Sequence, residues 1–324
     1  MERWARAASV ASVAAIALLA MLLAARALAM PVPYLWGGSE ARVTLPPALA
    51  YDLPPVAGEG DASKPLVMID PGHGGFDYGA RAPGFDEKAL TLGLALALRD
   101  RLVADGGYRV AMTRDDDSFV ALGERAEAAR GLGADLFLSI HADSAGIDNT
   151  RAGEIAGASI YTLSERASDA AARRFAAREN AADRINGQAL SGQSAAVNAI
   201  LVDLSQRRTQ AESERLAALI EQVGQGRLVF HPDPRRSAAL EVLRAPDVPS
   251  VLFESGYITN PRDAARLASR AGRTEFAGVM ARAIRLWFAQ ARIEAERRGE
   301  AATASDTAPD TAPDTAIASS GTEP

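Results

Sequence analysis

Apolar positions between residues 65 and 298 form short runs that alternate with longer segments of helical spacing. Short continuous apolar runs are typical of buried strands, and apolar residues three or four positions apart are typical of helices. The runs that predict strands are 66–70, 108–113, 134–142, 157–164 and 249–258, and those that predict helices are 87–105, 121–133 and 274–298. This alternation predicts an α/β fold with a mostly parallel twisted sheet and helices on both faces.

The segment from about residue 164 to 226 interrupts this alternation, because it contains no run that predicts a strand. Residues 164–188 and 194–224 both have the composition and spacing of helices. We therefore expect a helical insertion before the last strands of the sheet. Insertions of this size on an α/β scaffold often gate a site or select its substrate.

The two ends of the chain differ from the part between them. Residues 1–29 contain two early arginines, an uncharged apolar stretch and the small-x-small sequence Ala27-Leu28-Ala29, which predicts a signal peptide. An uncleaved anchor is the alternative, since a membrane span needs roughly 20 apolar residues. Residues 30–64 are rich in Pro and Gly and predict a linker or N-terminal arm, and residues 299–324, with a TAPD repeat, predict a disordered tail.

The charge and composition of the whole chain limit the kinds of site that the predicted domain, residues 65–298, can form. The net charge of −6 disfavours a general nucleic-acid binder, which needs clustered Lys and Arg. The chain has no cysteine, so disulfides and thiolate sites are excluded, and any metal ion must be held by His, Asp or Glu. The chain has only three histidines.

Two of these histidines stand at the carboxyl ends of predicted strands. His73 follows the strand 66–70 within the turn sequence GHGG, and His141 ends the strand 134–142. Ligands of open α/β sheets bind outside the carboxyl ends of strands. Each histidine could instead simply end its strand with a polar side chain, but the shared placement favours a common site.

Two glutamates are expected near the same edge. Glu87 begins the helix that follows the first strand, where a carboxylate also interacts favourably with the helix dipole. Glu254 lies within the apolar strand 249–258, where a charge is costly unless it has a partner. Two histidines and one carboxylate are sufficient for a catalytic zinc site, and a second carboxylate could transfer protons. Structural roles as a helix-end carboxylate or a salt-bridge partner remain the alternatives.

Four motifs at these residues, IDPGHGGFDYGA, EK, SIHADS and VLFESGYITN, resemble the zinc-dependent N-acetylmuramoyl-L-alanine amidases that separate daughter cells in Gram-negative bacteria. The resemblance extends over about residues 65–288 and implies a periplasmic enzyme that acts on peptidoglycan. It implies His73, Glu87 and His141 as zinc ligands and Glu254 as the catalytic base. Arg114 and Arg125 are expected to order the loop between them by charge pairing.

The insertion resembles the segment that covers the active site in cell-division members until an activator protein binds. This resemblance implies that an insertion glutamate occupies a zinc position, with Glu165 and Glu179 as candidates, and Glu165 is favoured because it follows the strand directly. The alternatives are another zinc amide hydrolase acting on cell-wall peptide or amino sugar, or an inactive peptidoglycan-binding relative. The N-terminal arm is too short for the β-rich targeting module of many members, since a sandwich needs about 100 residues.

Overall fold

The computed structural model describes residues 53–58, 60–145, 153–181, 184–185, 188–189 and 199–306. All of these except 301–306 belong to one compact unit, residues 45–300. The predicted signal peptide, most of the N-terminal arm and residues 307–324 lie outside the described residues. Among the described helices, none combines the length and the apolar character that a membrane crossing requires.

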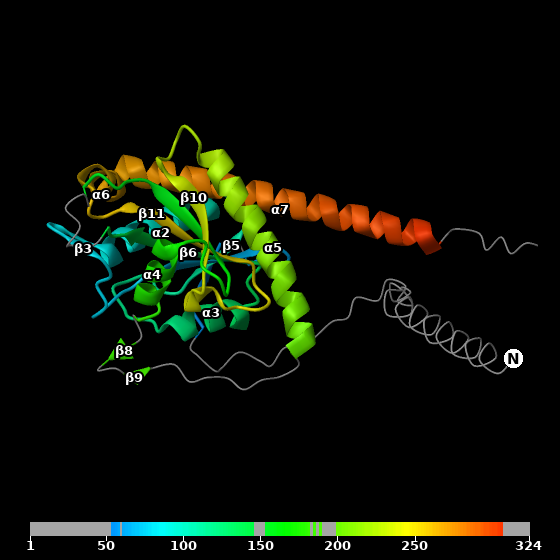
Figure 1. Cartoon of the computed structure of the whole chain (residues 1–324). Coiled ribbons are helices and arrows are strands. Elements are labelled where there is room, and N and C mark those ends of the chain that lie inside the picture. The colour runs from blue at the N-terminus through cyan, green and yellow to red at the C-terminus, as the bar shows by residue number, and fades with distance from the viewer. Residues whose placement is uncertain are drawn as a thin grey trace, which may run out of the picture. The chain divides into compact units, whose positions relative to one another are not determined.

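A seven-stranded sheet forms the centre of the described unit, with the strand order β1-β5-β2-β6-β11-β7-β10 (Figure 1). The strands are β1 Val56–Ala57, β2 Leu66–Pro71, β5 Arg109–Met112, β6 Leu136–Asp143, β7 Ala158–Leu163, β10 Phe230–Ala238 and β11 Ser250–Tyr257. The neighbours β5, β2, β6 and β11 are parallel, as are β7 and β10, whereas β1 and β7 run antiparallel to β5 and β11. The predicted α/β fold with a mostly parallel sheet is confirmed.

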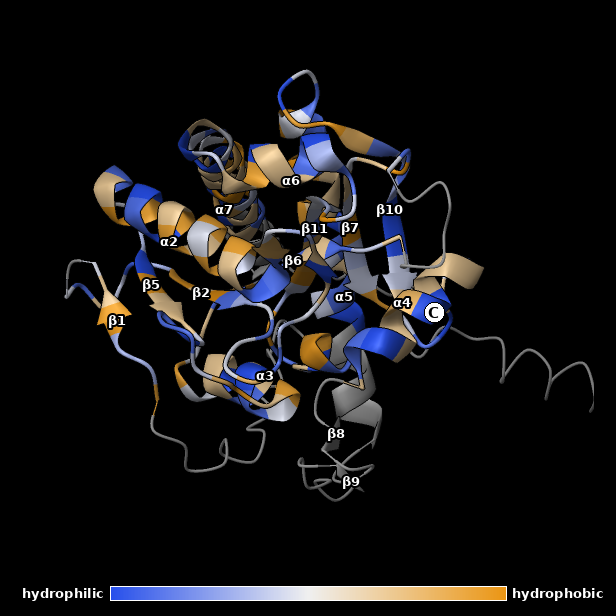
Figure 2. Cartoon of the chain, turned by 90° about the vertical axis from the view of Figure 1, so that its left-hand side faces the viewer, coloured by the Kyte–Doolittle hydropathy of each residue, from blue (hydrophilic) through white to orange (hydrophobic). Residues whose placement is uncertain are grey.

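Helices cover both faces of this sheet (Figure 2). One face packs on α2 Glu87–Asp105, α5 Ala199–Gly224, α6 Pro261–Ala268 and α7 Arg270–Asp306; the other packs on α3 Leu122–Gly131, α4 Ala170–Glu179 and the 3₁₀ helix η1 Glu241–Leu243. In β2, Val67 and Ile69 point into the first core, and Leu66 and Met68 into the second. Successive side chains of a strand point to opposite faces, so the continuous apolar run fills both cores.

The insertion differs from the prediction in one respect. Between α4 and α5 the chain forms a short antiparallel hairpin of β8 Arg184–Ile185 and β9 Gln188–Ala189. Strands of two residues leave no periodic pattern, so the prediction of an insertion without strands was wrong at this point. A second small hairpin, β3 Arg81–Ala82 with β4 Phe85–Asp86, leads from the GHGG turn into α2.

Two elements near the ends of the described residues cross the predicted boundaries. β1 lies within the predicted arm and pairs with the sheet edge, Val56 opposite Ala111. The helix α7 begins at Arg270 and extends to Asp306, past residue 299 where the tail was predicted to start. The alanine-rich sequence after Gly299 favours helix, and one glycine within a helix costs only about 1 kcal/mol.

Candidate metal centre

The turn after β2 places His73 at the carboxyl edge of the sheet. His73 itself has a left-handed backbone conformation, with φ of 62°. A Cβ atom on Gly72 would lie 2.4 Å from the ring of His141, so a glycine there lets the two histidines approach each other. Their ring centroids are 4.8 Å apart. The turn sequence therefore matters for the packing of the two rings as well as for the direction of the chain.

Glu87 is held between the same two histidines at the start of α2. The backbone N–H of Ala80 donates to its Oε2 at 2.6 Å, and the N–H of Ala142 donates to its Oε1 at 2.9 Å. A Cβ atom on Gly79 would lie 2.6 Å from Oε2, so this position also requires a glycine. The carboxylate is 2% exposed and is fixed from both sides by the backbone.

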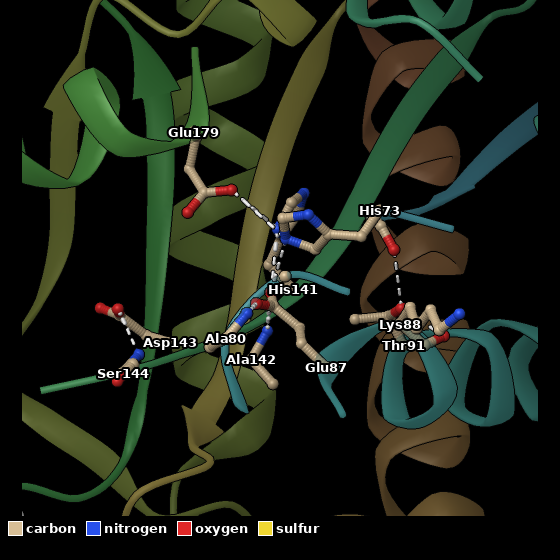
Figure 3. Close-up of polar contacts among 12 residues, drawn as sticks. His73, Ala80, Glu87, Lys88, Thr91, His141, Ala142, Asp143, Ser144 and Glu179 are labelled. Carbon is tan, nitrogen blue, oxygen red and sulfur yellow. Dashed lines mark hydrogen bonds and ion pairs between the residues drawn. The ribbon is translucent and has the colours of Figure 1, made fainter. Parts of the chain in front are cut away.

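Four side chains converge on one point between β2, β6 and α4 (Figure 3). Glu87 Oε1 lies 3.2 Å from His73 Nε2 and 3.1 Å from His141 Nδ1. Glu179 Oε2 lies 3.4 Å from each of the same two nitrogens. The other ring nitrogen of His73, Nδ1, lies 2.7 Å from Asp77 Oδ2. Two imidazoles and two carboxylates thus face one another in a buried place.

The charges of this cluster favour a cation. Burial alone would lower the pKa of His73, but Glu87, Asp77 and Glu179 raise it well above its ordinary value. Burial would raise the pKa of Glu87, but His73 and His141 hold it well below its usual range. His73 Nε2 is buried without a hydrogen-bond partner among the described residues. Imidazole nitrogens and carboxylate oxygens at these separations fit a metal ion, with Asp77 orienting the ring of His73.

Two buried arginines support the turn that carries His73. Arg125 pairs with Asp70 at 2.8 Å and donates to the carbonyls of Pro71 and His73 at 3.0 and 2.9 Å. Arg114 donates to the carbonyls of Pro71 and Gly72 at 3.0 and 2.8 Å. Both guanidiniums are buried. The sequence predicted that they order the loop between them by charge pairing; instead they donate to the loop carbonyls of Asp116 and Val120 and chiefly bind the backbone around His73.

Glu254 lies on β11 beside these residues, in register with His141 on β6. It is 1% exposed, and neither carboxylate oxygen has a hydrogen-bond partner among the described residues. Burial raises the pKa of Glu254 well above its usual range, and the carboxylates of Asp143, Glu87 and Glu179 raise it further. A buried carboxyl group with a raised pKa beside a metal-binding cluster is suited to proton transfer.

The two insertion glutamates lie in different places. Glu179, the last residue of α4, reaches the histidines, whereas the Glu165 side chain is 77% exposed and pairs with Arg244 at 3.1 Å. The preference for Glu165 as the nearer residue was therefore wrong. The helix α4 carries the chain back over the site, so the last turn of α4 faces the histidines, and the segment before α4, which contains Glu165, does not.

Sequence reasoning also missed three polar residues that complete the cluster. Asp77 binds His73, and Arg178 joins the insertion to the sheet by contacting Asp143 at 2.7 Å and Glu179 at 3.0 Å. Asp77 lies four residues after His73 and Asp143 two residues after His141, so their proximity in sequence was an available signal. Arg178 is one of several arginines in α4, and no local pattern distinguishes it.

Residues 67–285 match the N-acetylmuramoyl-L-alanine amidase family. The chain is 39% identical over 228 residues to the N-acetylmuramoyl-L-alanine amidase AmiA of Salmonella typhimurium, covering 70% of this chain and 77% of the relative. It is 36% identical over 233 residues to AmiC of Neisseria meningitidis serogroup B, covering 71% of this chain and 54% of that relative. The solved structure of Ami1 from Mycobacterium smegmatis, 21% identical, shares the fold with a TM-score of 0.50 over 70% of this chain and 97% of its own. The chain therefore belongs to the N-acetylmuramoyl-L-alanine amidase family.

Proposed function

We propose that this chain hydrolyses the amide bond between N-acetylmuramic acid and L-alanine in peptidoglycan, with zinc as its metal. The main support is the position of one atom, Glu87 Oε1, within 3.2 Å of nitrogens of both His73 and His141. The choice of substrate is supported by the relatives, which are named N-acetylmuramoyl-L-alanine amidases. Another zinc amide hydrolase or an inactive peptidoglycan-binding relative is the alternative.

The chain's own residues divide into ligands and a proton carrier. His73, Glu87 and His141 would hold zinc, which, when bound, polarises the amide carbonyl and activates water for attack. Glu254 would take a proton on a carboxylate oxygen and deliver it to the leaving amine. Its burial and the neighbouring carboxylates raise its pKa, so it holds a proton more strongly than an ordinary glutamate does. Asp77 keeps Nε2 of His73 directed at the ligand position.

The insertion is proposed to hold the enzyme in an inhibited state. Glu179 Oε2 lies 3.4 Å from both histidine nitrogens, where it would take a position at the metal that water or substrate needs. A periplasmic activator protein that binds the insertion and draws α4 away would release this position. The N-terminal pattern and the Gram-negative relatives support export to the periplasm and a role in daughter-cell separation.

Product analysis tests the proposed reaction. Purified sacculi incubated with the zinc-loaded protein should release stem peptides with a free L-alanine amino terminus, identified by mass spectrometry, and a chelator should stop the release. New termini elsewhere in the peptide, or on a deacetylated sugar, would support another zinc hydrolase. If a zinc-loaded Glu179→Gln protein releases no product, the result would support the alternative that the chain is an inactive peptidoglycan-binding relative.

The Glu254→Gln variant tests the proton carrier. It should keep its zinc content and lose about 10²- to 10⁴-fold in turnover, the usual contribution of general acid–base catalysis. Glu275→Gln, an exposed glutamate of α7, is the matched control and should keep full activity. Full activity of Glu254→Gln would refute the assignment.

A further inference from the structure

An exposed aromatic side chain stands three residues after His73. Phe76 is 55% exposed, and its ring stacks on that of Phe119 with centroids 4.2 Å apart and an interplanar angle of 29°. Contiguous exposed apolar patches rimmed by polar residues often mark a binding surface, and two stacked rings are more than one scattered apolar residue. Neither ring is used by the catalytic assignment above.

The loop that carries Phe76 is fixed by hydrogen bonds that leave the ring uncovered. The N–H groups of Gly74 and Asp77 donate to each other's carbonyls at 2.9 and 3.1 Å. The N–H of Gly75 donates to Asp117 Oδ1 at 3.0 Å, and Lys88 donates to the Gly75 carbonyl and Asp117 Oδ2, both at 2.7 Å. The exposed ring is therefore held in place in advance, and a ligand that binds it loses little loop entropy.

Both aromatic residues adjoin the candidate metal centre. Asp77, the neighbour of Phe76, contacts His73 at 2.7 Å. Phe119 lines the same pocket as His73, His141 and Glu179. In this stacked pair of rings, here called the aromatic pair, Phe119 lines the pocket of the proposed metal ligands and Phe76 packs on Phe119 from outside that lining.

We infer that the aromatic pair is a subsite that binds a pyranose ring of the glycan strand. This inference rests on the proposed function, because a scissile amide attached to a sugar brings a sugar ring to the rim of the pocket. The apolar C–H face of a pyranose fits a flat aromatic face, whose quadrupole attracts polarised hydrogens. Two exposed carboxylates, Asp115 and Asp116, lie shortly before Phe119 in addition to Asp117, which is paired with Lys88; they disfavour an acidic peptide there, whereas an uncharged sugar is unaffected.

Calorimetric titration of the full-length protein with chitotetraose, a tetramer of β-linked N-acetylglucosamine without stem peptide, tests the subsite. Phe76→Ala should weaken binding about threefold to tenfold, the size of one aromatic stacking contact, and Phe76→Trp should retain it. Leu286→Ala on α7, also an exposed apolar residue, is the control and should bind as the wild type does. Thermal melting should be unchanged in all three variants.

Kinetics on glycan strands that carry stem peptides give a second readout. Phe76→Ala should raise KM by a similar factor and leave kcat unchanged. Equal chitotetraose affinity for Phe76→Ala and wild type would overturn the inference, and so would an effect confined to binding of free stem peptide. If the wild type releases no stem peptide but Phe76→Ala still weakens sugar binding, the proposed function fails and the subsite stands.

Discussion

The two sides of the candidate metal centre are held in different ways. His73, Glu87 and His141 come from the turn after β2, from α2 and from β6, and they are fixed by backbone donors and by Asp70, Arg114 and Arg125, all buried. We call this side the sheet side. Buried polar groups that hydrogen-bond to one another resist displacement, because each group loses a partner if another moves.

The opposite side is the single residue Glu179 at the end of α4. This ten-residue helix packs through a few apolar residues, among them Phe175, whose ring stacks on Tyr161 at 4.5 Å. Its polar links to the rest of the fold include Arg178, whose side chain is 45% exposed and pairs with Asp143, and the C-cap Asn180, which donates to the Ala239 carbonyl at 2.7 Å. Ion pairs of partly exposed side chains contribute little, so the proposed ligands of the sheet side are held more firmly than the carboxylate of Glu179. Local opening is expected where buried contacts are few.

The largest expected effect is on the sheet side. Arg125→Met should lower the free energy of unfolding by about 3–5 kcal/mol, because it leaves Asp70 charged and buried without its partner. Metal affinity should fall about 10- to 100-fold, as for other residues that orient ligands. Urea denaturation and chelator competition measure the two quantities. Arg101→Met, which breaks an exposed pair with Asp105, should change neither; equal effects of both variants would contradict the comparison.

Glu254 stands on β11, between β6 of the sheet side and β7, and its pKa makes stability depend on pH. Its folded pKa is raised, so ionisation weakens the fold as pH rises above the unfolded value of about 4.3. In chelator, Glu254→Gln should therefore be more stable than wild type by about 1–3 kcal/mol at pH 7, because the amide is neutral whereas the unpartnered buried carboxyl group carries the added cost of ionisation. The difference should vanish near pH 4. A constant difference across pH, measured by denaturation, would contradict it.

Removing the carboxylate of Glu179 should raise activity, in contrast to the losses expected on the sheet side, and the change should be smaller. Glu179→Gln should retain zinc and release stem peptides from sacculi several-fold faster, because it frees one position at the metal. Glu165→Gln is the matched control, since Glu165 is exposed on the same insertion, and its rate should equal that of wild type. A loss of zinc in Glu179→Gln would place Glu179 among the permanent ligands and remove the distinction between the two sides.

The smallest effect is expected at the link between α4 and β6. Arg178→Met should lower the free energy of unfolding by about 1 kcal/mol, because the Arg178 side chain is 45% exposed although its partner Asp143 is only 10% exposed. Amide hydrogen exchange should nevertheless quicken in α4 while that of α3 stays unchanged. Faster exchange in both helices would show that Arg178 stabilises the whole fold rather than the position of α4.

Local sequence was a reliable guide where a site residue follows directly from a strand or helix end. His73, His141 and Glu254 lie at or near the ends of strands that are apolar enough to be recognised, and Glu87 begins a helix with clear spacing. The choice between Glu165 and Glu179 could not be made in this way, because it depends on the direction of α4 over the sheet. The backbone role of Arg114 and Arg125 was equally hidden, since their acceptors lie more than 40 residues away or in a turn.

The sequence by itself determined the α/β fold, the carboxyl-edge position of the site and the four residues proposed for its chemistry, because strand periodicity and glycine turns are local properties. Only the tertiary structure decided which carboxylate of the insertion meets the histidines, which arginines hold the His73 turn and that Phe76 lies beside the pocket. These depend on the packing of segments distant in sequence, and the free energy of such contacts is set by burial and geometry that no local pattern encodes.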